Sequence, residues 1–319
     1  PRQPAARSRP GLERARHAAP FPVSSAEAAG MSADGARARG GAGGGSAGET
    51  RKALSVIVPT YNEVENIRPL CERLFKAVKD AGLTTELVVV DDESAGSDET
   101  ARIVRELGEQ GFPVRIHCRK RVEGRGLSSA VLLGFQMAKH DVVLCMDADL
   151  QHEPESVPAV AEPVLSGSAE FSIGSRHVAG GGLGFEWSKF RQLVSWGATL
   201  LAWPVAASTD PMSGFFCTSK PVLGRAEGRL NLIGFKIGLE IMARCRCHPV
   251  KDVAITFQER NAGESKLSAK QYQLYLQQLA GLYVDWGSAS IFGRCLRLRP
   301  SSLRRFLLPP FLSSSSSSS

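Results

Sequence analysis

Short apolar runs alternate with amphipathic segments between residues 54 and 146, and this alternation constrains the fold more than any other feature. The apolar runs predict strands at 54–58, 86–90, 114–117 and 142–146. Apolar residues at helical spacing predict helices at 64–79, 97–107 and 127–138. Continuous apolar strands separated by helices are typical of a parallel sheet buried on both faces. The sequence therefore predicts an α/β fold, a Rossmann-like, mostly parallel sheet with helices on both faces.

The net charge of +7 does not belong to the predicted fold. Residues 1–52 contain nine Lys and Arg against four Asp and Glu, and residues 285–319 contain five against one. The ends thus carry +5 and +4, which leaves −2 for residues 53–284. A nucleic-acid-binding protein needs basic residues clustered on its folded domain. The placement of charge therefore argues against a nucleic-acid partner.

The chain divides by composition into three parts. Residues 1–52 form an Ala/Gly/Arg-rich leader, which is predicted to be disordered because it cannot bury enough apolar surface. Residues 53–284 form the predicted folded domain, and residues 285–319 form a basic, Ser-rich tail. No stretch reaches the roughly 18 apolar residues of a membrane span. The seven cysteines lack CxxC spacing, which favours reduced thiols facing the cytosol.

Polar side chains follow three of the predicted strands. The segments are Pro-Thr-Tyr-Asn-Glu at 59–63, Asp-Asp-Glu-Ser at 91–94 and Asp-Ala-Asp-Leu-Gln-His at 147–152. Asp and Asn are ordinary loop residues, so each segment alone has a structural explanation. All three, however, are expected at the carboxyl edge of one sheet, where ligands of α/β proteins bind. So many carboxylates would repel one another unless a cation shared the site.

The Asp-x-Asp step at Asp147 and Asp149 has the chemistry of a metal site. Two carboxylates separated by the small Ala148 can direct oxygen atoms at one ion, and the amide of Gln151 can add a neutral oxygen. Oxygen ligands suit Mg²⁺ or Mn²⁺, which leave coordination positions for water and diphosphate. No glycine-rich phosphate loop with its Lys-Ser/Thr is present, and no GxGxxG follows the first predicted strand. The predicted ligand is a nucleotide diphosphate held through a metal.

These three motifs resemble those of the family 2 glycosyltransferases, enzymes of the GT-A fold. Five further motifs follow in order: RGLSSAV at 125–131, GSRH at 174–177, DPMSGFF at 210–216, GFKI at 234–237 and GESKL at 263–267. Together they resemble the dolichyl-phosphate β-mannosyltransferases, particularly the fungal-like branch. The resemblance extends from about residue 54 to residue 284.

The resemblance implies a hexosyltransferase that moves mannose from GDP-mannose to dolichyl phosphate with inversion. The product would be dolichyl β-D-mannosyl phosphate, used for N-glycan, O-mannosyl and GPI-anchor synthesis. The implied location is the cytosolic face of the endoplasmic reticulum membrane. Two alternatives remain open: a UDP-glucose-dependent dolichyl-phosphate β-glucosyltransferase, and an inactive nucleotide-sugar-binding subunit.

The resemblance also implies site residues. Asp147 and Asp149 would be catalytic, and Asp147, Asp149 and Gln151 would hold Mg²⁺ or Mn²⁺. The nucleotide sugar would contact Pro59, Tyr61, Glu63, Val90, Asp92, Asp147, Ala148, Asp149, Gln151, Arg176, Arg260 and Lys266. Of these, Arg176, Arg260 and Lys266 would bind the diphosphate.

The acceptor side is less defined. The basic cluster of Lys120, Arg121 and Arg125 is either a binding site for the acceptor phosphate or a solvated loop. Trp196 and Trp203 are seven residues apart on one helical face, which suits either a membrane interface or the core. Because the tail stands where the fungal-like branch has a hydrophobic anchor, we expect attachment through the membrane surface or through small membrane-anchoring subunits.

Overall fold

A computed structural model of the chain describes residues 52–184, 189–259 and 269–287. Its main sheet has seven strands: β1 (Ala53–Thr60), β2 (Thr84–Asp91), β3 (Val114–Cys118), β4 (Val142–Cys145), β5 (Phe171–Ser175), β7 (Phe216–Ser219) and β8 (Val250–Ala254). The strand order is β3-β2-β1-β4-β7-β5-β8, and every pairing is parallel except the two made by β7. The predicted mostly parallel sheet is confirmed.

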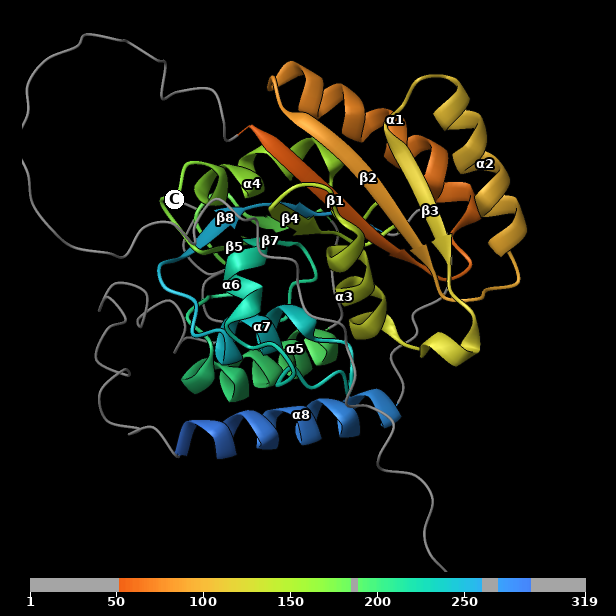
Figure 1. Ribbon diagram of the computed structural model, residues 1–319. Coiled ribbons are helices and arrows are strands. Elements are labelled where there is room, and N and C mark those ends of the chain that lie inside the picture. Colours follow the sequence, from red (N-terminus) through yellow and green to blue (C-terminus); the bar gives the residue numbers. More distant parts are fainter. Residues whose placement is uncertain (1–51, 185–188, 260–268, 288–319) are drawn as a thin grey trace, which may run out of the picture.

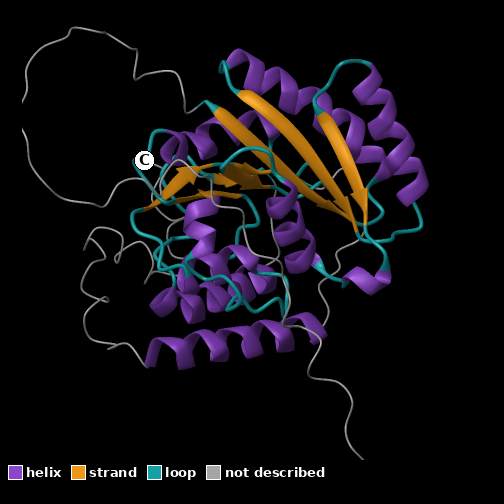
Figure 2. Cartoon of the chain, viewed as in Figure 1, coloured by secondary structure: helices purple, strands orange, loops and turns teal. Residues whose placement is uncertain are grey.

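Helices cover both faces of the sheet, as Figures 1 and 2 show. On one face lie α1 (Val64–Asp80), α2 (Ser97–Glu109) and α4 (Val157–Leu165). On the other lie α3 (Leu127–Met137), α5 (Lys189–Ala202), α6 (Lys220–Gly224), α7 (Ile237–Arg244) and α8 (Ala269–Gly287). The remaining elements are η1 (Arg121–Glu123), η2 (Pro154–Ser156), η3 (Trp203–Val205) and the short parallel pair of β6 (Gly182–Leu183) with β9 (Thr256–Phe257).

Local sequence pattern explains the elements before residue 146. In α1, the apolar residues Ile67, Leu70, Leu74 and Val78 recur every three or four positions and are at most 2% exposed. Each strand and helix predicted up to that point is present, with ends shifted by at most three residues.

Alternation along the strands divides the core into two layers. In β2, Leu87 and Val89 pack toward α1 and α2, whereas Val88 and Val90 pack toward α3. The carboxyl ends of β1, β2 and β4 consequently meet at one edge, between the two helical layers.

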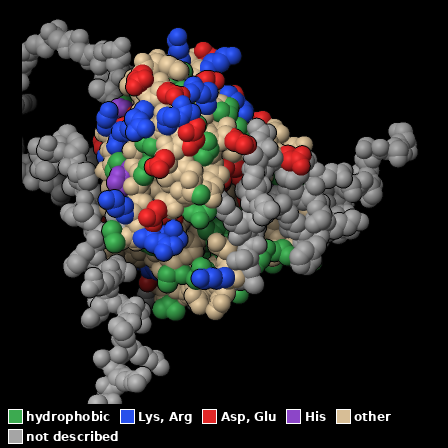
Figure 3. Space-filling model, turned by 90° about the vertical axis from the view of Figure 1, so that its right-hand side faces the viewer, with side chains coloured by type: hydrophobic (Ala, Val, Ile, Leu, Met, Phe, Trp, Pro, Cys, Tyr) green, Lys and Arg blue, Asp and Glu red, His purple; other side chains and the backbone are tan. Residues whose placement is uncertain are grey.

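The described surface bears on two possible partners. No helix among the described residues is both long enough and apolar enough to span a bilayer. On the face shown in Figure 3, acidic and basic side chains are interspersed. A single-sign basic patch of the kind that nucleic-acid binding requires is not visible on that face.

Candidate active site

A cavity of about 500 Å³ opens at the carboxyl edge of the sheet. It is lined by residues at or just after the carboxyl ends of β1, β2, β4 and β5, and by residues of α5 and α8. Nine of the predicted site residues line it: Pro59, Tyr61, Glu63, Asp92, Asp147, Ala148, Asp149, Gln151 and Arg176. Segments that are far apart in the sequence therefore form one site, as the strand-end argument predicts.

Three predicted residues are not among the lining residues. The Val90 side chain is fully buried between the sheet and α3, because alternation along β2 directs it into the core. It does not face the cavity, so any contact of Val90 with a ligand would have to come from its backbone. Arg260 and Lys266 lie outside the residues that the structure describes.

The backbone is strained at three of the strand ends. Asn62, Glu93 and Leu150 have φ values of 59°, 50° and 61°, in the left-handed region. Asn62 and Glu93 each directly follow a predicted site residue, and Leu150 stands between two of them. A non-glycine residue in this conformation costs energy that the surrounding fold must offset, and such residues concentrate at functional sites. The strain supports a functional reading of this edge.

The two neighbouring aspartates at the carboxyl end of β2, Asp91 in its last position and Asp92 directly after it, have different environments. Asp91 is fully buried, and its carboxylate accepts hydrogen bonds from the hydroxyls of Thr60 (3.0 Å), Ser94 (3.0 Å) and Ser97. It therefore closes the turn after β2. Asp92 is the member of the pair that lines the cavity.

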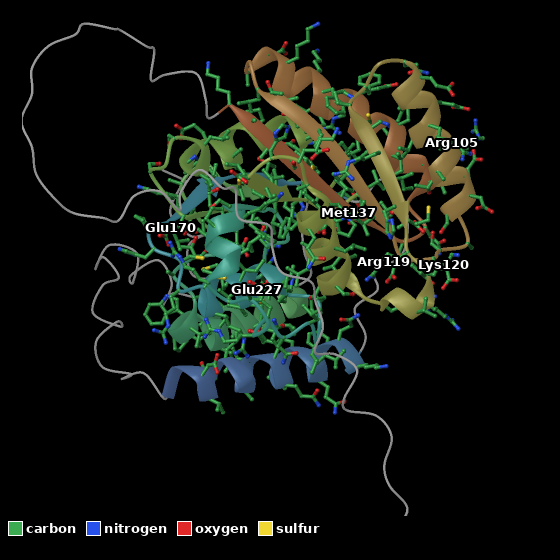
Figure 4. The ribbon with its side chains drawn as sticks, in the orientation of Figure 1. Arg105, Arg119, Lys120, Met137, Glu170 and Glu227 are labelled. Carbon is green, nitrogen blue, oxygen red and sulfur yellow. The ribbon has the colours of Figure 1, made fainter. Side chains whose placement is uncertain are left out.

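Asp92 is held in place by a buried arginine. Arg119, at the end of β3 in Figure 4, is 1% exposed and donates from Nη2 to Asp92 Oδ1 at 2.7 Å. The backbone N–H of Gly126 donates to Asp92 Oδ2 at 2.8 Å, and Arg119 also donates to Ser129 Oγ at 2.8 Å. Asp92 is thus fixed as a hydrogen-bond acceptor in the cavity wall. The adjacent Lys120 is exposed. Two basic residues therefore stand side by side in the sequence, and the sequence alone does not tell which of them is buried.

The oxygen atoms of Asp147, Asp149 and Gln151 are the candidate metal ligands. Among the described residues, no three His, Cys, Asp or Glu side chains are already clustered as a metal centre. The three side chains nonetheless line one cavity and offer only hard oxygen donors, which fits a Mg²⁺ or Mn²⁺ ion that completes its shell with water and diphosphate. Gly214 leaves room for them, because a Cβ there would approach the Asp147 carboxylate oxygens to 3.1 and 3.2 Å.

His152 adds no positive charge to this group. It is 2% exposed and packs against the rings of Phe215 and Phe257, with centroids 5.2 and 5.3 Å away. Burial lowers the pKa of His152 to about 4, so the imidazole is neutral at neutral pH. Its Nδ1 accepts a hydrogen bond from the backbone N–H of Asp147 at 3.4 Å. The ring therefore supports the Asp-x-Asp loop.

Arg176 is fixed by a buried carboxylate. Its Nε and Nη2 donate to the two oxygens of Asp210 at 2.7 and 2.8 Å, and Asp210 is fully buried. Burial alone would raise the pKa of Asp210, but the Arg176 guanidinium outweighs it and holds that pKa below its usual range. The guanidinium also lies 5.1 Å from the centre of the Phe257 ring. Asp210 belongs to the DPMSGFF motif, but its partner could not be read from the motif.

Lys236 also lines the cavity, and the sequence analysis did not nominate it. Its Nζ donates to the carbonyl of Met212 at 2.6 Å and lies 4.6 Å from the centre of the Phe235 ring. Removal from water lowers the pKa of Lys236 to about 8, with the charge of Arg176 acting in the same direction. Lys236 belongs to the GFKI motif that the sequence analysis noted, but the motif alone gave no role to this lysine.

The basic cluster of Lys120, Arg121 and Arg125 does not line the cavity. Arg121 and Arg125 are exposed, and each is 3.9 Å from a carboxylate oxygen of Glu93. Of the two explanations given for this cluster, the structure favours the solvated loop.

Known proteins resemble this chain in sequence and in fold. Residues 55–223 match the glycosyl transferase family 2. The chain belongs to that family. It is 44% identical to the dolichol-phosphate mannosyltransferase of Saccharomyces cerevisiae over 237 residues, covering 72% of this chain and 86% of the yeast protein. It is 41% identical to the dolichol-phosphate mannosyltransferase of Mycosarcoma maydis over 238 residues, covering 72% and 79%.

This chain shares its fold with a solved structure of glucosyl-3-phosphoglycerate synthase from Mycobacterium tuberculosis. That structure is a complex with Mn²⁺, UDP and glucosyl-3-phosphoglycerate. The TM-score is 0.52 at 20% identity, with 74% of this chain and 80% of that chain covered. The predicted GT-A fold and the predicted glycosyltransferase class are both confirmed.

Proposed function

We propose that the chain transfers mannose from GDP-mannose to dolichyl phosphate with inversion at the anomeric carbon. The cavity carries this proposal: it joins the carboxylates of the Asp-x-Asp loop to two cationic side chains and to an apolar wall of α5 and α8. Such a cavity suits a nucleotide sugar on one side and a lipid phosphate on the other. The names of the yeast and M. maydis relatives support the same acceptor and the same sugar.

The reaction is a single displacement. An oxygen of the acceptor phosphate forms a bond to the mannose anomeric carbon, and the bond from that carbon to the diphosphate oxygen breaks, releasing GDP. A phosphomonoester with a second pKa near 6 is largely dianionic at neutral pH, so the chain need not supply a strong base. The described residues therefore have to position two anions and stabilise the charge that develops on the diphosphate.

Each group in the site has a place in this scheme. Arg176, oriented by Asp210, would contact the diphosphate together with Arg260 and Lys266. A Mg²⁺ or Mn²⁺ ion bound by Asp147, Asp149 and Gln151 would neutralise charge on the departing diphosphate. The Mn²⁺ and UDP in the M. tuberculosis enzyme support a divalent metal.

Asp92 bears on which nucleobase the sugar donor carries. Both oxygens of Asp92 accept hydrogen bonds, from Arg119 and from Gly126, and these bonds hold the side chain on the cavity wall as an acceptor. Guanine offers two adjacent donors, its N1–H and its amino group, whereas uracil offers one N–H between two carbonyl acceptors. Asp92 therefore favours GDP-mannose over UDP-glucose.

One assay separates the proposed function from its alternatives. The purified protein is incubated with dolichyl phosphate, Mn²⁺ and either GDP-mannose or UDP-glucose, and the lipid-linked sugar is quantified. We expect transfer from GDP-mannose. Transfer from UDP-glucose alone would identify the glucosyltransferase, and no transfer from either donor would favour the inactive binding subunit.

We further propose that α5 and α8 contact the membrane surface, on the cytosolic face of the endoplasmic reticulum, with or without small anchoring subunits. Four aliphatic side chains of these helices are more than 45% exposed: Leu193, Leu201, Leu276 and Val284. Trp196 and Trp203, on which the sequence argument relied, are half-buried. These four exposed side chains therefore carry this proposal, since a helix that exposes large apolar side chains favours a lipid interface.

Replacing Leu276 with glutamate tests the membrane contact. We expect about a tenfold weaker association with phosphatidylcholine–phosphatidylserine liposomes, because the substitution removes the free energy that the apolar leucine side chain gains on entering the interface. Sedimentation with liposomes measures the effect. Val122→Glu makes the same kind of change at a side chain that is 91% exposed in η1, and it should leave association unchanged. Equal losses in both variants would argue against a specific lipid-binding face.

A further inference from the structure

Arg176 and Asp210 bind each other although neither belongs to a helix or a strand. Arg176 directly follows β5, and Asp210 lies in the loop between η3 and β7. The Arg176 side chain is 10% exposed and that of Asp210 is fully buried. Charges removed from water are stabilised only when their partner is close and well aligned. The backbone on both sides of this pair therefore has to be held by contacts from elsewhere in the fold.

Asp252 holds the loop from the neighbouring edge of the sheet. It lies in β8, which pairs with β5 at one end of the strand order (Figure 1). Its Oδ1 accepts a hydrogen bond from Ser208 Oγ at 2.6 Å. Its Oδ2 accepts two, from the backbone N–H and the hydroxyl of Thr209, at 2.9 and 2.8 Å. A carboxylate on a regular strand thus binds the two residues that directly precede Asp210.

The Ser208 hydroxyl connects Asp252 to Asp210. It donates to Asp252 and accepts a hydrogen bond from the backbone N–H of Asp210 at 3.1 Å. Ser208 is 4% exposed, so this connection lies inside the protein. The Asp210 carboxylate also accepts a bond from the backbone N–H of Arg176 at 3.2 Å, in addition to the two from its side chain. Asp252 therefore fixes the backbone of the residue that binds Arg176.

The Thr209 hydroxyl connects Asp252 to the other side of the pair. It has one hydrogen, which it donates to Asp252. Ser175 Oγ lies 2.8 Å from Thr209 Oγ1 and must therefore be the donor in that contact. Ser175 Oγ in turn accepts a hydrogen bond from the backbone N–H of His177 at 3.1 Å. The two residues that flank Arg176 in the chain are thus bonded into the same network.

We propose that Asp252 is a positioning residue for the nucleotide-sugar donor. Through Ser208 and Thr209 it holds Asp210 and Arg176 against each other, so that the guanidinium is aimed at the diphosphate before the donor binds. Asp252 is not among the residues that line the cavity, so its effect has to pass through this pair. A cation fixed in advance loses less entropy on binding. The inference rests on the proposed function, which assigns the diphosphate to Arg176.

Asp252→Asn disturbs the network with little change of shape. An amide has one oxygen and one NH₂ group, so it accepts from Thr209 or from Ser208 but not from both. We expect the Kd for GDP, measured by calorimetry with Mn²⁺, to rise about tenfold, as for a weakened hydrogen bond to a charged group. The control is Asp141→Asn, the same substitution at an exposed aspartate, which should leave this Kd unchanged.

A second background distinguishes positioning from general support of the fold. R176M/D210A lacks both charges of the pair, so no buried charge is left without a partner. If Asp252 acts through the pair, Asp252→Asn should change the Kd for GDP by less than about twofold in this background. Thr209→Val removes one hydroxyl of the network and should raise the Kd by a smaller factor, again only when the pair is present. No change of Kd in the otherwise unaltered protein, or equal changes in both backgrounds, would overturn the role of Asp252.

The outcomes separate this inference from the proposed function. If the unaltered protein binds GDP but transfers no mannose, the proposed function fails and the role of Asp252 is still decided by the Kd values. If it transfers mannose and the two backgrounds respond equally to Asp252→Asn, the inference alone fails.

A further measurement needs no nucleotide. The Arg176 Nε–H is bonded to Asp210 at 2.7 Å, and in ¹⁵N-arginine-labelled protein its signal is identified by its loss in R176K. We expect Asp252→Asn to speed the exchange of this hydrogen with water at least about fivefold, because local opening of the pair becomes easier. Asp141→Asn should not affect it. An unchanged exchange rate in the Asp252 variant would contradict the proposal even if the protein binds another nucleotide.

Discussion

Replacing Asp149 with asparagine is expected to lower mannose transfer by about 10³-fold while leaving the protein folded. Asp149 is 6% exposed and lines the cavity, and its Oδ1 accepts a hydrogen bond from the Gln151 backbone at 3.2 Å. Asparagine has nearly the same shape but one anionic oxygen fewer for a divalent ion. Initial rates at saturating substrate and Mg²⁺ give the loss of turnover, and the paramagnetic relaxation of water protons gives the affinity for Mn²⁺.

The control is Asp141→Asn, the same substitution at an exposed aspartate just before β4. It should change neither turnover nor Mn²⁺ affinity. Near-normal turnover of the Asp149 variant at saturating Mg²⁺ would remove Asp149 from the metal site.

Replacing Asp210 with alanine is expected to destabilise the protein by about 3–5 kcal/mol and to abolish most transfer. Arg176 is only 10% exposed, so its guanidinium would be left buried without the carboxylate that now binds it at 2.7 and 2.8 Å. A buried charge without a partner is costly, and the freed side chain would no longer be aimed at the diphosphate. Urea denaturation gives the free energy of unfolding, and kcat/KM for GDP-mannose gives the functional effect.

The double variant R176M/D210A separates stability from function. Removing both charges should restore much of the lost stability without restoring transfer, because the two residues are directly coupled. The exposed pair of Arg73 and Glu155 has the same two-bond geometry, at 2.8 and 2.7 Å, so Glu155→Ala should cost at most about 1 kcal/mol. A D210A protein of unchanged stability would show that the buried pair does not hold Arg176.

The comparison of Asp91 with Asp92 shows what a local pattern cannot decide. Both lie at the carboxyl end of β2, and the sequence analysis placed both at the edge of the sheet. Hydroxyls from the β1 end and from the start of α2 bind Asp91, whereas Arg119 and Gly126 hold Asp92 at the cavity. These partners are up to 34 residues away in the chain, so neighbouring residues do not predict them.

The sequence by itself determined the α/β class, the strands and helices up to residue 146 and the edge at which the site lies. Apolar periodicity and residues at strand ends are local properties, and the chemistry of Asp147 and Asp149 depends on their spacing. The ordered motifs determined the family.

Only the tertiary structure decided which charged groups face one another. It placed Asp210 against Arg176, Val90 in the core, and Lys236 in a cavity with Asp147, from which it is separated by 89 positions in the chain. The antiparallel insertion of β7 between β4 and β5 brings these segments together. The physical reason is that contacts between distant segments depend on how the chain crosses the sheet, and neither periodicity nor net charge contains that information.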